Sequence, residues 1–113
     1  MRVVLQVISG TSQGREIPLQ SGERARFGSS DVSDVCFPND LEMAGVHFEI
    51  ECLTDACLVR HVSGAGGTWL NDQPVHESAF VDGDEILAGQ TRLKALLQGG
   101  PALNTVTEPE SAS

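Results

Sequence analysis

The most regular stretch of the sequence covers residues 46–52 and reads Val46-His47-Phe48-Glu49-Ile50-Glu51-Cys52. Apolar and polar side chains alternate along it, so an extended strand would turn its even-numbered side chains towards a core and its odd-numbered ones outwards. Asp55 then marks a turn into a second apolar stretch, residues 57–62. The two stretches together predict a β-hairpin with one buried face.

Similar patterns extend in both directions from this hairpin. Short apolar runs separated by turn residues occur at residues 3–8, 15–19, 24–27, 68–70, 85–87 and 91–97. Before residue 90, no stretch keeps a 3.6-residue apolar period over three helical turns. About ten to eleven short strands at this spacing predict an all-β sandwich.

The composition changes near the C-terminal end. Residues 99–113 are rich in Gly, Pro, Ser and Thr and contain no apolar alternation. Because 113 residues fit one domain, we expect a single domain over residues 1–98. We expect residues 99–113 to form a flexible tail or the beginning of a linker, in a natural chain that continues further.

The charge balance excludes several classes of partner. Seven Lys and Arg residues against 16 Asp and Glu residues give a net charge of −9. Nucleic acids and anionic membrane surfaces both require a basic face, so neither is expected as a partner. There is no run of about 20 apolar residues and no signal-peptide pattern at the start. We therefore expect a cytoplasmic location and no membrane insertion of this segment.

The three cysteines, Cys36, Cys52 and Cys57, are an odd number without a Cys-x-x-Cys motif. This favours a reducing compartment, with buried thiols on facing strands as the structural interpretation of the last two. A zinc site built from those two cysteines with His47 and His61 fits no known spacing, so no metal and no cofactor are expected. No nucleophile, base and orienting group can be assembled either, which argues against an enzyme.

Five segments, in order and spacing, resemble the motifs of a forkhead-associated (FHA) domain. They read Phe27-Gly28-Ser29, Ser33-Asp34-Val35-Cys36-Phe37, Met43-Ala44-Gly45-Val46-His47-Phe48, Gly64-Ala65-Gly66-Gly67-Thr68-Trp69-Leu70-Asn71 and Val81-Asp82-Gly83-Asp84-Glu85-Ile86-Leu87-Ala88-Gly89. The resemblance spans roughly residues 3 to 97 and implies a β-sandwich that binds phosphothreonine peptides through loops at one end.

The positions that would hold the phosphate and the peptide differ from the family pattern. Ser29 and Gly45 stand where the family has arginines, Ala44 and Gly64 where it has serines, and Gly66 where it has an asparagine. A dianionic phosphate needs charge-assisted hydrogen bonds, preferably from arginine. We therefore expect phosphopeptide binding to be lost, although backbone N–H groups of residues 63–67 leave a weak anion site open.

The positions that maintain the FHA scaffold are retained. By resemblance, the structural residues are Gly28, His47, Gly67, Thr68, Gly83, Asp84 and Gly89. Asn71 is retained as well, and we place it among the partner-binding positions of the loops. We expect His47 to be a buried strut and His61 and His76 to be surface residues.

A protein partner is expected to meet the loops through apolar contacts. Trp69 is either a core residue or an exposed anchor, and Leu41 and Met43 are the other candidate anchors. Aromatic side chains in such positions frequently dominate binding energy.

Two functions follow from the resemblance. The first is a phosphate-independent interaction module of a bacterial secretion system. Its setting is either a type VI accessory or adaptor protein or the cytoplasmic domain of a type III inner-ring protein. The lack of a membrane span favours the type VI setting. The alternative is a phosphothreonine reader with unusual ligands.

Overall fold

The computed structural model describes residues 1–64 and 66–98 and contains eleven strands. The strands are β1 (Arg2–Ser9), β2 (Glu16–Gln20), β3 (Arg24–Gly28), β4 (Val35–Cys36), β5 (Phe48–Cys52), β6 (Cys57–His61), β7 (Thr68–Leu70), β8 (Gln73–Pro74), β9 (Glu77–Phe80), β10 (Glu85–Ala88) and β11 (Thr91–Gln98). The described residues contain no helix, and therefore no helix long and apolar enough to cross a membrane. The expected tail, residues 99–113, lies outside the described residues.

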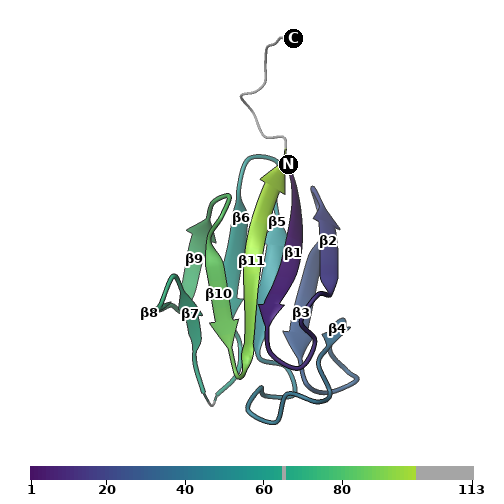
Figure 1. Cartoon of the computed structure of the whole chain (residues 1–113). Helices are drawn as coiled ribbons and strands as arrows, with labels where there is room; N and C mark the ends of the chain where they lie inside the picture. Colours follow the sequence, from purple (N-terminus) through teal and green to yellow (C-terminus); the bar gives the residue numbers. More distant parts are fainter. Residues whose placement is uncertain (65, 99–113) are drawn as a thin grey trace.

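The strands form two sheets packed face to face (Figure 1). One sheet has the order β2-β1-β11-β10-β7-β8 and the other β4-β3-β5-β6-β9. All neighbours pair antiparallel except β3 and β4, which are parallel. The first and last strands lie side by side, with Arg2 opposite Gln98. The predicted all-β sandwich is confirmed.

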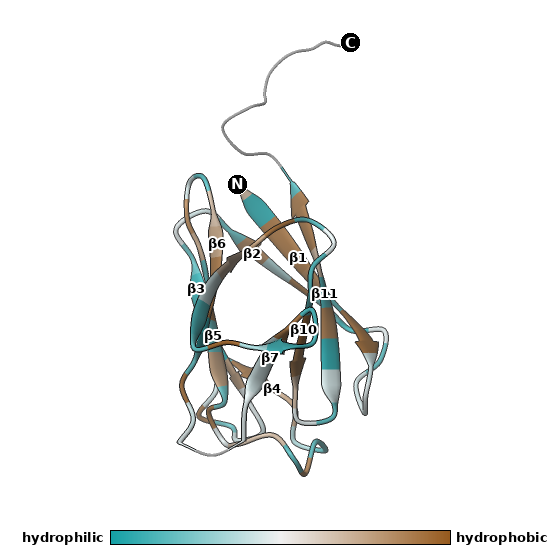
Figure 2. Ribbon diagram, turned by 90° about the vertical axis from the view of Figure 1, so that its left-hand side faces the viewer, coloured by the Kyte–Doolittle hydropathy of each residue, from teal (hydrophilic) through white to brown (hydrophobic). Residues whose placement is uncertain are grey.

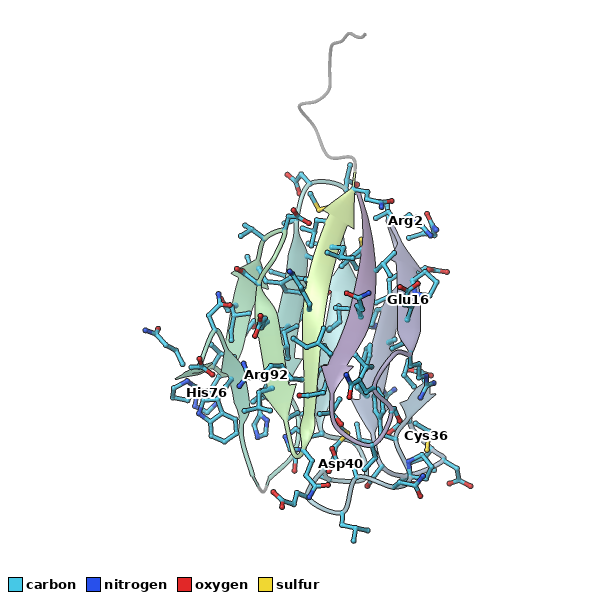
Figure 3. All side chains as sticks on the ribbon, viewed as in Figure 1. Arg2, Glu16, Cys36, Asp40, His76 and Arg92 are labelled. Atoms are coloured by element: carbon cyan, nitrogen blue, oxygen red, sulfur yellow. The ribbon has the colours of Figure 1, made fainter. Side chains whose placement is uncertain are left out.

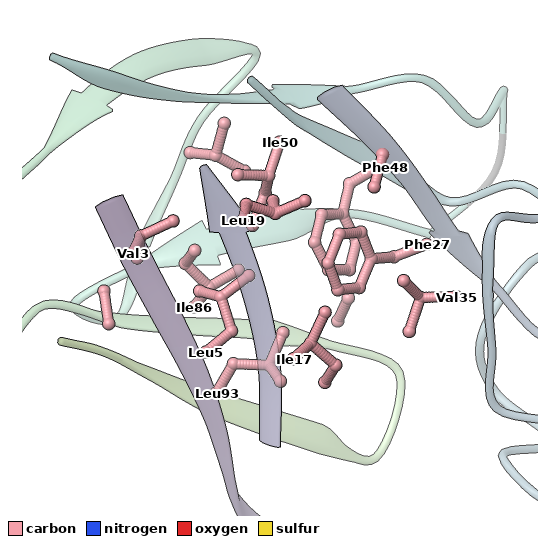
Figure 4. Close-up of a cluster of buried hydrophobic side chains, with 14 of the residues drawn as sticks. Val3, Leu5, Ile17, Leu19, Phe27, Val35, Phe48, Ile50, Ile86 and Leu93 are labelled. Carbon is pink, nitrogen blue, oxygen red and sulfur yellow. The ribbon is translucent and has the colours of Figure 1, made fainter. Parts of the chain in front are cut away.

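The core lies between the sheets because alternate residues of the strands point inwards. Hydrophobic residues, brown in Figure 2, lie along strands such as β1, β6 and β10. Figure 4 shows apolar side chains of both sheets meeting. The rings of Phe27 and Phe48 stack with centroids 4.8 Å apart, a separation typical of favourable aromatic pairs. Four phenylalanines, all buried, compensate for the absence of tyrosine.

The hairpin of residues 46–62 is present, but its first two residues differ from the alternation. The strand begins at Phe48, His47 is only 1% exposed, and Val46 is half-buried. The expected pattern of an inward Val46 and an outward His47 is therefore wrong. Residues 46 and 47 belong to the preceding loop, where the hydrogen bonds of the His47 ring determine its direction.

The loops that carry the candidate site gather at one end of the sandwich, the lower end in Figure 1. We call residues 29–34, 37–47, 62–64 and 66–67 the apical loops. They connect β3 to β4, β4 to β5 and β6 to β7. The β5–β6 turn and the β9–β10 turn lie at the opposite end.

Candidate functional site

His47 connects two of the apical loops from below. Its Nδ1 accepts the backbone N–H of Ala44 at 3.0 Å, and its Nε2 lies 2.7 Å from the carbonyl oxygen of Gly67. Because the first contact occupies the Nδ1 lone pair, the Nε2 nitrogen carries the proton and donates it to Gly67. The buried ring is thus a strut between residues 44 and 67, which is the geometry expected of a structural histidine.

His61 is not the simple surface residue that the sequence suggested. It is half-buried, its Nδ1 lies 2.9 Å from the Thr68 hydroxyl, and its ring meets His47 edge-on with centroids 5.4 Å apart. Burial, followed by the neighbouring His47 and His76, lowers the pKa of His61 below its usual 6.5. His76 is exposed, as expected, and Figure 3 shows it at the periphery of the sandwich.

The first two apical loops are bonded directly to each other where the family has its phosphate ligands. The Ser29 hydroxyl donates to the carbonyl of Met43 at 2.8 Å, and its N–H donates to Ala44 at 2.9 Å. The Ser33 hydroxyl donates to the carbonyl of Gly45. The Ser29 and Ser33 hydroxyls therefore donate to carbonyls inside the protein and not to a ligand.

Gly28 and Gly45 explain why these loops can approach so closely. A Cβ atom on Gly28 would lie 2.0 Å from the carbonyl oxygen of Gly45 and 2.6 Å from the Ser33 hydroxyl. Neither distance is compatible with a side chain at position 28. The expected structural role of Gly28 thus has a specific physical basis.

Asp40 is a site residue that the sequence analysis missed. It is 1% exposed, and its carboxylate accepts the Gln90 N–H at 2.9 Å, the Thr91 hydroxyl at 2.7 Å and the Glu42 N–H at 3.1 Å. It fastens the second apical loop to the β10–β11 turn (Figure 3). A Cβ atom on Gly89 would lie 2.8 Å from this carboxylate, so the glycine leaves room for it.

Asn71 stabilises the opposite side of the site and is not placed to hold a peptide. It has a φ of 51°, in a tight turn with Asp72 between β7 and β8. Its side chain donates to Asp84 at 3.0 Å and accepts the Glu85 N–H at 3.0 Å. The expectation that Asn71 is a partner-binding residue is therefore corrected. The Asp84 carboxylate also accepts the N–H of Val81 at 2.8 Å, so it is placed to stabilise the β9–β10 turn.

The local geometry at Gly83 and Thr68 also fits a structural role for each residue. Gly83 has a φ of 89°, which glycine adopts without steric cost. Thr68 is 1% exposed and is held by His61, and a Cβ atom on Gly67 would lie 2.9 Å from the Trp69 ring.

Two surface hollows lie on either side of the β6–β7 loop. The first, of about 400 Å³, is lined by Glu42, His47, Gly66, Gly67, Trp69, Asp72, Leu87 and Gly89. The second, of about 460 Å³, is lined by His61, Ser63, Gly64, Gly66, Gly67, Thr68, Pro74, Val75 and His76. Gly66 and Gly67 line both hollows, so the glycine-rich loop forms a low ridge between them.

The candidate anchors differ in their accessibility. Leu41 is 89% exposed at the tip of an apical loop, and Trp69 is half-buried on the wall of the first hollow. Met43 is only 4% exposed and packs in the core. Its expected role as an anchor is therefore wrong, because the loop turns its side chain inwards.

The apical loops carry negative charge and no Lys or Arg. Their sequences contain the carboxylates of Asp31, Asp34, Asp40 and Glu42. Two arginines of the β4-β3-β5-β6-β9 sheet are paired on its outer face: Arg24 with Glu49 at 3.3 Å, and Arg60 with Glu51 at 2.8 Å. The apical loops themselves are thus acidic, and the Arg15 guanidinium beside them donates to the Cys36 carbonyl at 2.7 Å.

The comparison with protein families gives a match over most of the chain. Residues 6–98 match the model of the cytoplasmic domain of the inner-membrane component of type III secretion systems. The chain belongs to this family. Comparison with curated proteins gives no match.

Solved structures identify the fold of this family member as that of an FHA domain. The FHA domain of the CT664 protein from Chlamydia trachomatis matches with a TM-score of 0.81 at 20% identity, over 88% of this chain and 100% of that one. The FhaA FHA domain, solved in complex with the intracellular domain of Rv3910, matches with a TM-score of 0.72 at 27% identity, over 82% and 98% of the two chains. An FHA domain from a study of phosphothreonine-dependent interactions matches with a TM-score of 0.77 at 25% identity, over 88% and 99%.

The chain is therefore an FHA domain of the type III secretion family. FHA domains are protein-interaction modules and not enzymes, and the similar structures include complexes with a protein domain and with a phosphopeptide. Gly28, His47 and Gly67 lie at the apical loops or beside them, whereas Gly83 and Asp84 lie in the β9–β10 turn at the opposite end of the sandwich.

Proposed function

We propose that this FHA domain binds a protein partner through its apical loops without recognising phosphate. The proposal rests on the lack of charged hydrogen-bond donors for a phosphate in the apical loops. Its loops contain no Lys or Arg, and the Ser29 hydroxyl is already donated to the Met43 carbonyl. Each lost hydrogen bond to a charged group costs roughly 1.5–3 kcal/mol, so several losses remove a micromolar site.

The charge of the loops supports the same conclusion. The chain carries a net charge of −9, and three of the four carboxylates of the apical loops, those of Asp31, Asp34 and Glu42, belong to exposed residues. A dianionic phosphate is repelled by such a surface, most strongly at low ionic strength. A neutral or basic protein surface has no such penalty.

We place the partner contact on the accessible part of these loops. Leu41 offers an exposed apolar side chain, and the hollow beside Trp69 offers a concave surface with an aromatic wall. Interfaces are typically dominated by a few such anchors surrounded by polar residues. Gly45, Gly64 and Gly66 are all exposed, so a partner can approach the backbone there.

The setting that we propose is the cytoplasmic side of a type III secretion apparatus. The family match supports this setting over the type VI accessory protein, which no comparison supports. The partner is then another cytoplasmic component of the same apparatus. A phosphothreonine reader with unusual ligands is the alternative function.

Site-specific photo-crosslinking in cells tests the proposal. A photo-reactive residue at Leu41, which is 89% exposed on an apical loop, should crosslink to a secretion component. The same residue at Val81, which is 64% exposed at the opposite end, is the matched control. The crosslink at position 41 should persist after phosphatase treatment of the lysate before irradiation. Loss of the crosslink on phosphatase treatment, or equal crosslinking at both positions, would contradict the proposal.

A further inference from the structure

Three sulfur atoms meet at the end of the sandwich opposite the apical loops. Cys52 and Cys57 both have 0% exposure, and their Sγ atoms lie 3.5 Å apart. The Sδ atom of Met1 lies 3.7 Å from the Cys57 sulfur. The proposed interaction surface uses none of these groups. The interpretation of the two cysteines as buried thiols on facing strands is confirmed.

The backbone places the two cysteines in a register that suits a covalent bond between them. They lie directly opposite each other on β5 and β6. The Cys52 N–H and carbonyl are bonded to the other neighbouring segment, to Glu23 at 2.8 Å and Gly22 at 2.7 Å. The cysteines are thus a non-hydrogen-bonded pair, in which Cα atoms are about 4.5 Å apart. This separation lies within the roughly 4.4–6.8 Å range of disulfides.

We propose that Cys52 and Cys57 are a redox modification site, at which a hydroperoxide converts the two thiols into a reversible disulfide across the β5–β6 hairpin. The strands need no change of register, because both sulfurs already lie on the core face of the hairpin. The sulfur atoms must approach each other by small side-chain rotations alone.

The hydrogen bond between the thiols assigns their order of reaction. The S–H of Cys57 donates to the Cys52 sulfur at 3.5 Å, and the S–H of Cys52 donates to the Met1 carbonyl at 3.4 Å. Burial, and then the hydrogen bond and charge of Cys52, raise the pKa of Cys57 to about 12. Cys52 is therefore the attacking sulfur and Cys57 is the resolving thiol that retains its proton.

The chemistry is a two-step oxidation of the pair. The Cys52 thiol gives up its proton as its sulfur attacks one oxygen of hydrogen peroxide, and the O–O bond breaks. The departing hydroxide takes that proton and becomes water, and a sulfenic acid remains on Cys52. The Cys57 sulfur then attacks the Cys52 sulfur, the S–S bond forms and the S–O bond breaks. The leaving oxygen takes the Cys57 proton, so the pair loses two electrons and the peroxide becomes two molecules of water. A thiol reductant reverses the reaction.

Mass spectrometry of the full chain tests this site. The native protein is treated with hydrogen peroxide at neutral pH, and the remaining thiols are then alkylated in denaturant. We expect the protein to lose two hydrogens and to take up one alkyl group, on the half-buried Cys36. Cleavage before Asp55 should leave the two cysteine-containing fragments joined until a reductant is added. The melting temperature should rise by roughly 5 °C on oxidation.

Three substitutions provide the controls. Cys36→Ala should show the same loss of two hydrogens with no alkyl group, whereas Cys52→Ala and Cys57→Ala should show no such loss. The proposal is overturned if the peroxide-treated native protein keeps three alkylatable thiols, or if only Cys36 reacts. Formation of the bond only in denaturant also overturns it. If Cys52→Ala and Cys57→Ala fail to fold, Cys36→Ala alone still tests the proposal. Its two fragments should be joined after peroxide treatment, and separate fragments would contradict the proposal.

Discussion

At the scale of single residues, His47 is the clearest structural element of the site. Its ring holds Ala44 and Gly67 together at 3.0 and 2.7 Å, while its backbone N–H donates to Phe27 at 2.8 Å. Replacing it by alanine leaves a partly buried N–H and a partly buried carbonyl unpaired, at a cost of up to about 1–3 kcal/mol for each group. We expect His47→Ala to lower the midpoint of urea unfolding clearly. His76→Ala, at an exposed position, is the control and should unfold like the parent protein. An unchanged midpoint for His47→Ala would contradict the structural role of His47.

The pKa of His61 predicts how stability depends on pH. Its folded-state pKa is lowered, chiefly by burial and then by His47 and His76. The unfolded chain therefore binds more protons below about pH 6.5, and the free energy of unfolding falls as the pH decreases through this range. Urea unfolding at pH 7.5 and pH 5.5 should show lower stability at the acidic value. His61→Asn should reduce the difference more than His76→Asn does, and equal effects would contradict the assignment.

At the scale of elements, the junction between β3 and the second apical loop is the most tightly packed contact of the site. Gly28→Ala would place a Cβ atom 2.0 Å from the Gly45 carbonyl, so the loop must move. Overpacking of this kind costs about 1–3 kcal/mol. Gly64→Ala is the matched control because no atom lies within 4 Å of its Cβ position. Thermal unfolding should show a markedly lower melting temperature for Gly28→Ala and little change for Gly64→Ala. Similar melting temperatures for the two variants would contradict this packing.

The elements also show what the sequence predicts and what it leaves open. The alternation of residues 48–52 predicts β5 correctly, because strand faces follow directly from a period of two. The inward direction of His47 and the carboxylate clamp of Asp40 are not predictable in this way. Both depend on partners distant in sequence, such as Gly67 for His47 and Gln90 and Thr91 for Asp40. The same holds for Asn71, whose side chain is bonded to a turn 13 residues away.

At the scale of the whole molecule, an intact FHA scaffold carries loops that lack the phosphate-binding side chains. If this is right, restoring the family's residues should restore phosphate recognition. The variant carries Ser29→Arg, Ala44→Ser, Gly45→Arg, Gly64→Ser and Gly66→Asn. Asparagine tolerates the φ of 70° at position 66 better than most residues do. We expect the variant to bind phosphothreonine peptides with a dissociation constant in the micromolar range.

One further protein serves as a control for this test. The same five substitutions on the His47→Ala background should bind more weakly, because the loops lose their support. A five-fold variant that folds and still ignores every phosphothreonine peptide would mean that the loop geometry itself, and not the missing side chains, has changed.

The central claim is tested most directly by calorimetry of the unmodified protein with a degenerate phosphothreonine peptide library at low ionic strength. Long-range electrostatic repulsion is strongest under these conditions. The account predicts no measurable heat of binding and no difference between the phosphorylated and dephosphorylated libraries. A dissociation constant tighter than about 10 μM, lost on dephosphorylation and weakened by Ser29→Ala, would contradict it and establish this domain as a phosphothreonine reader.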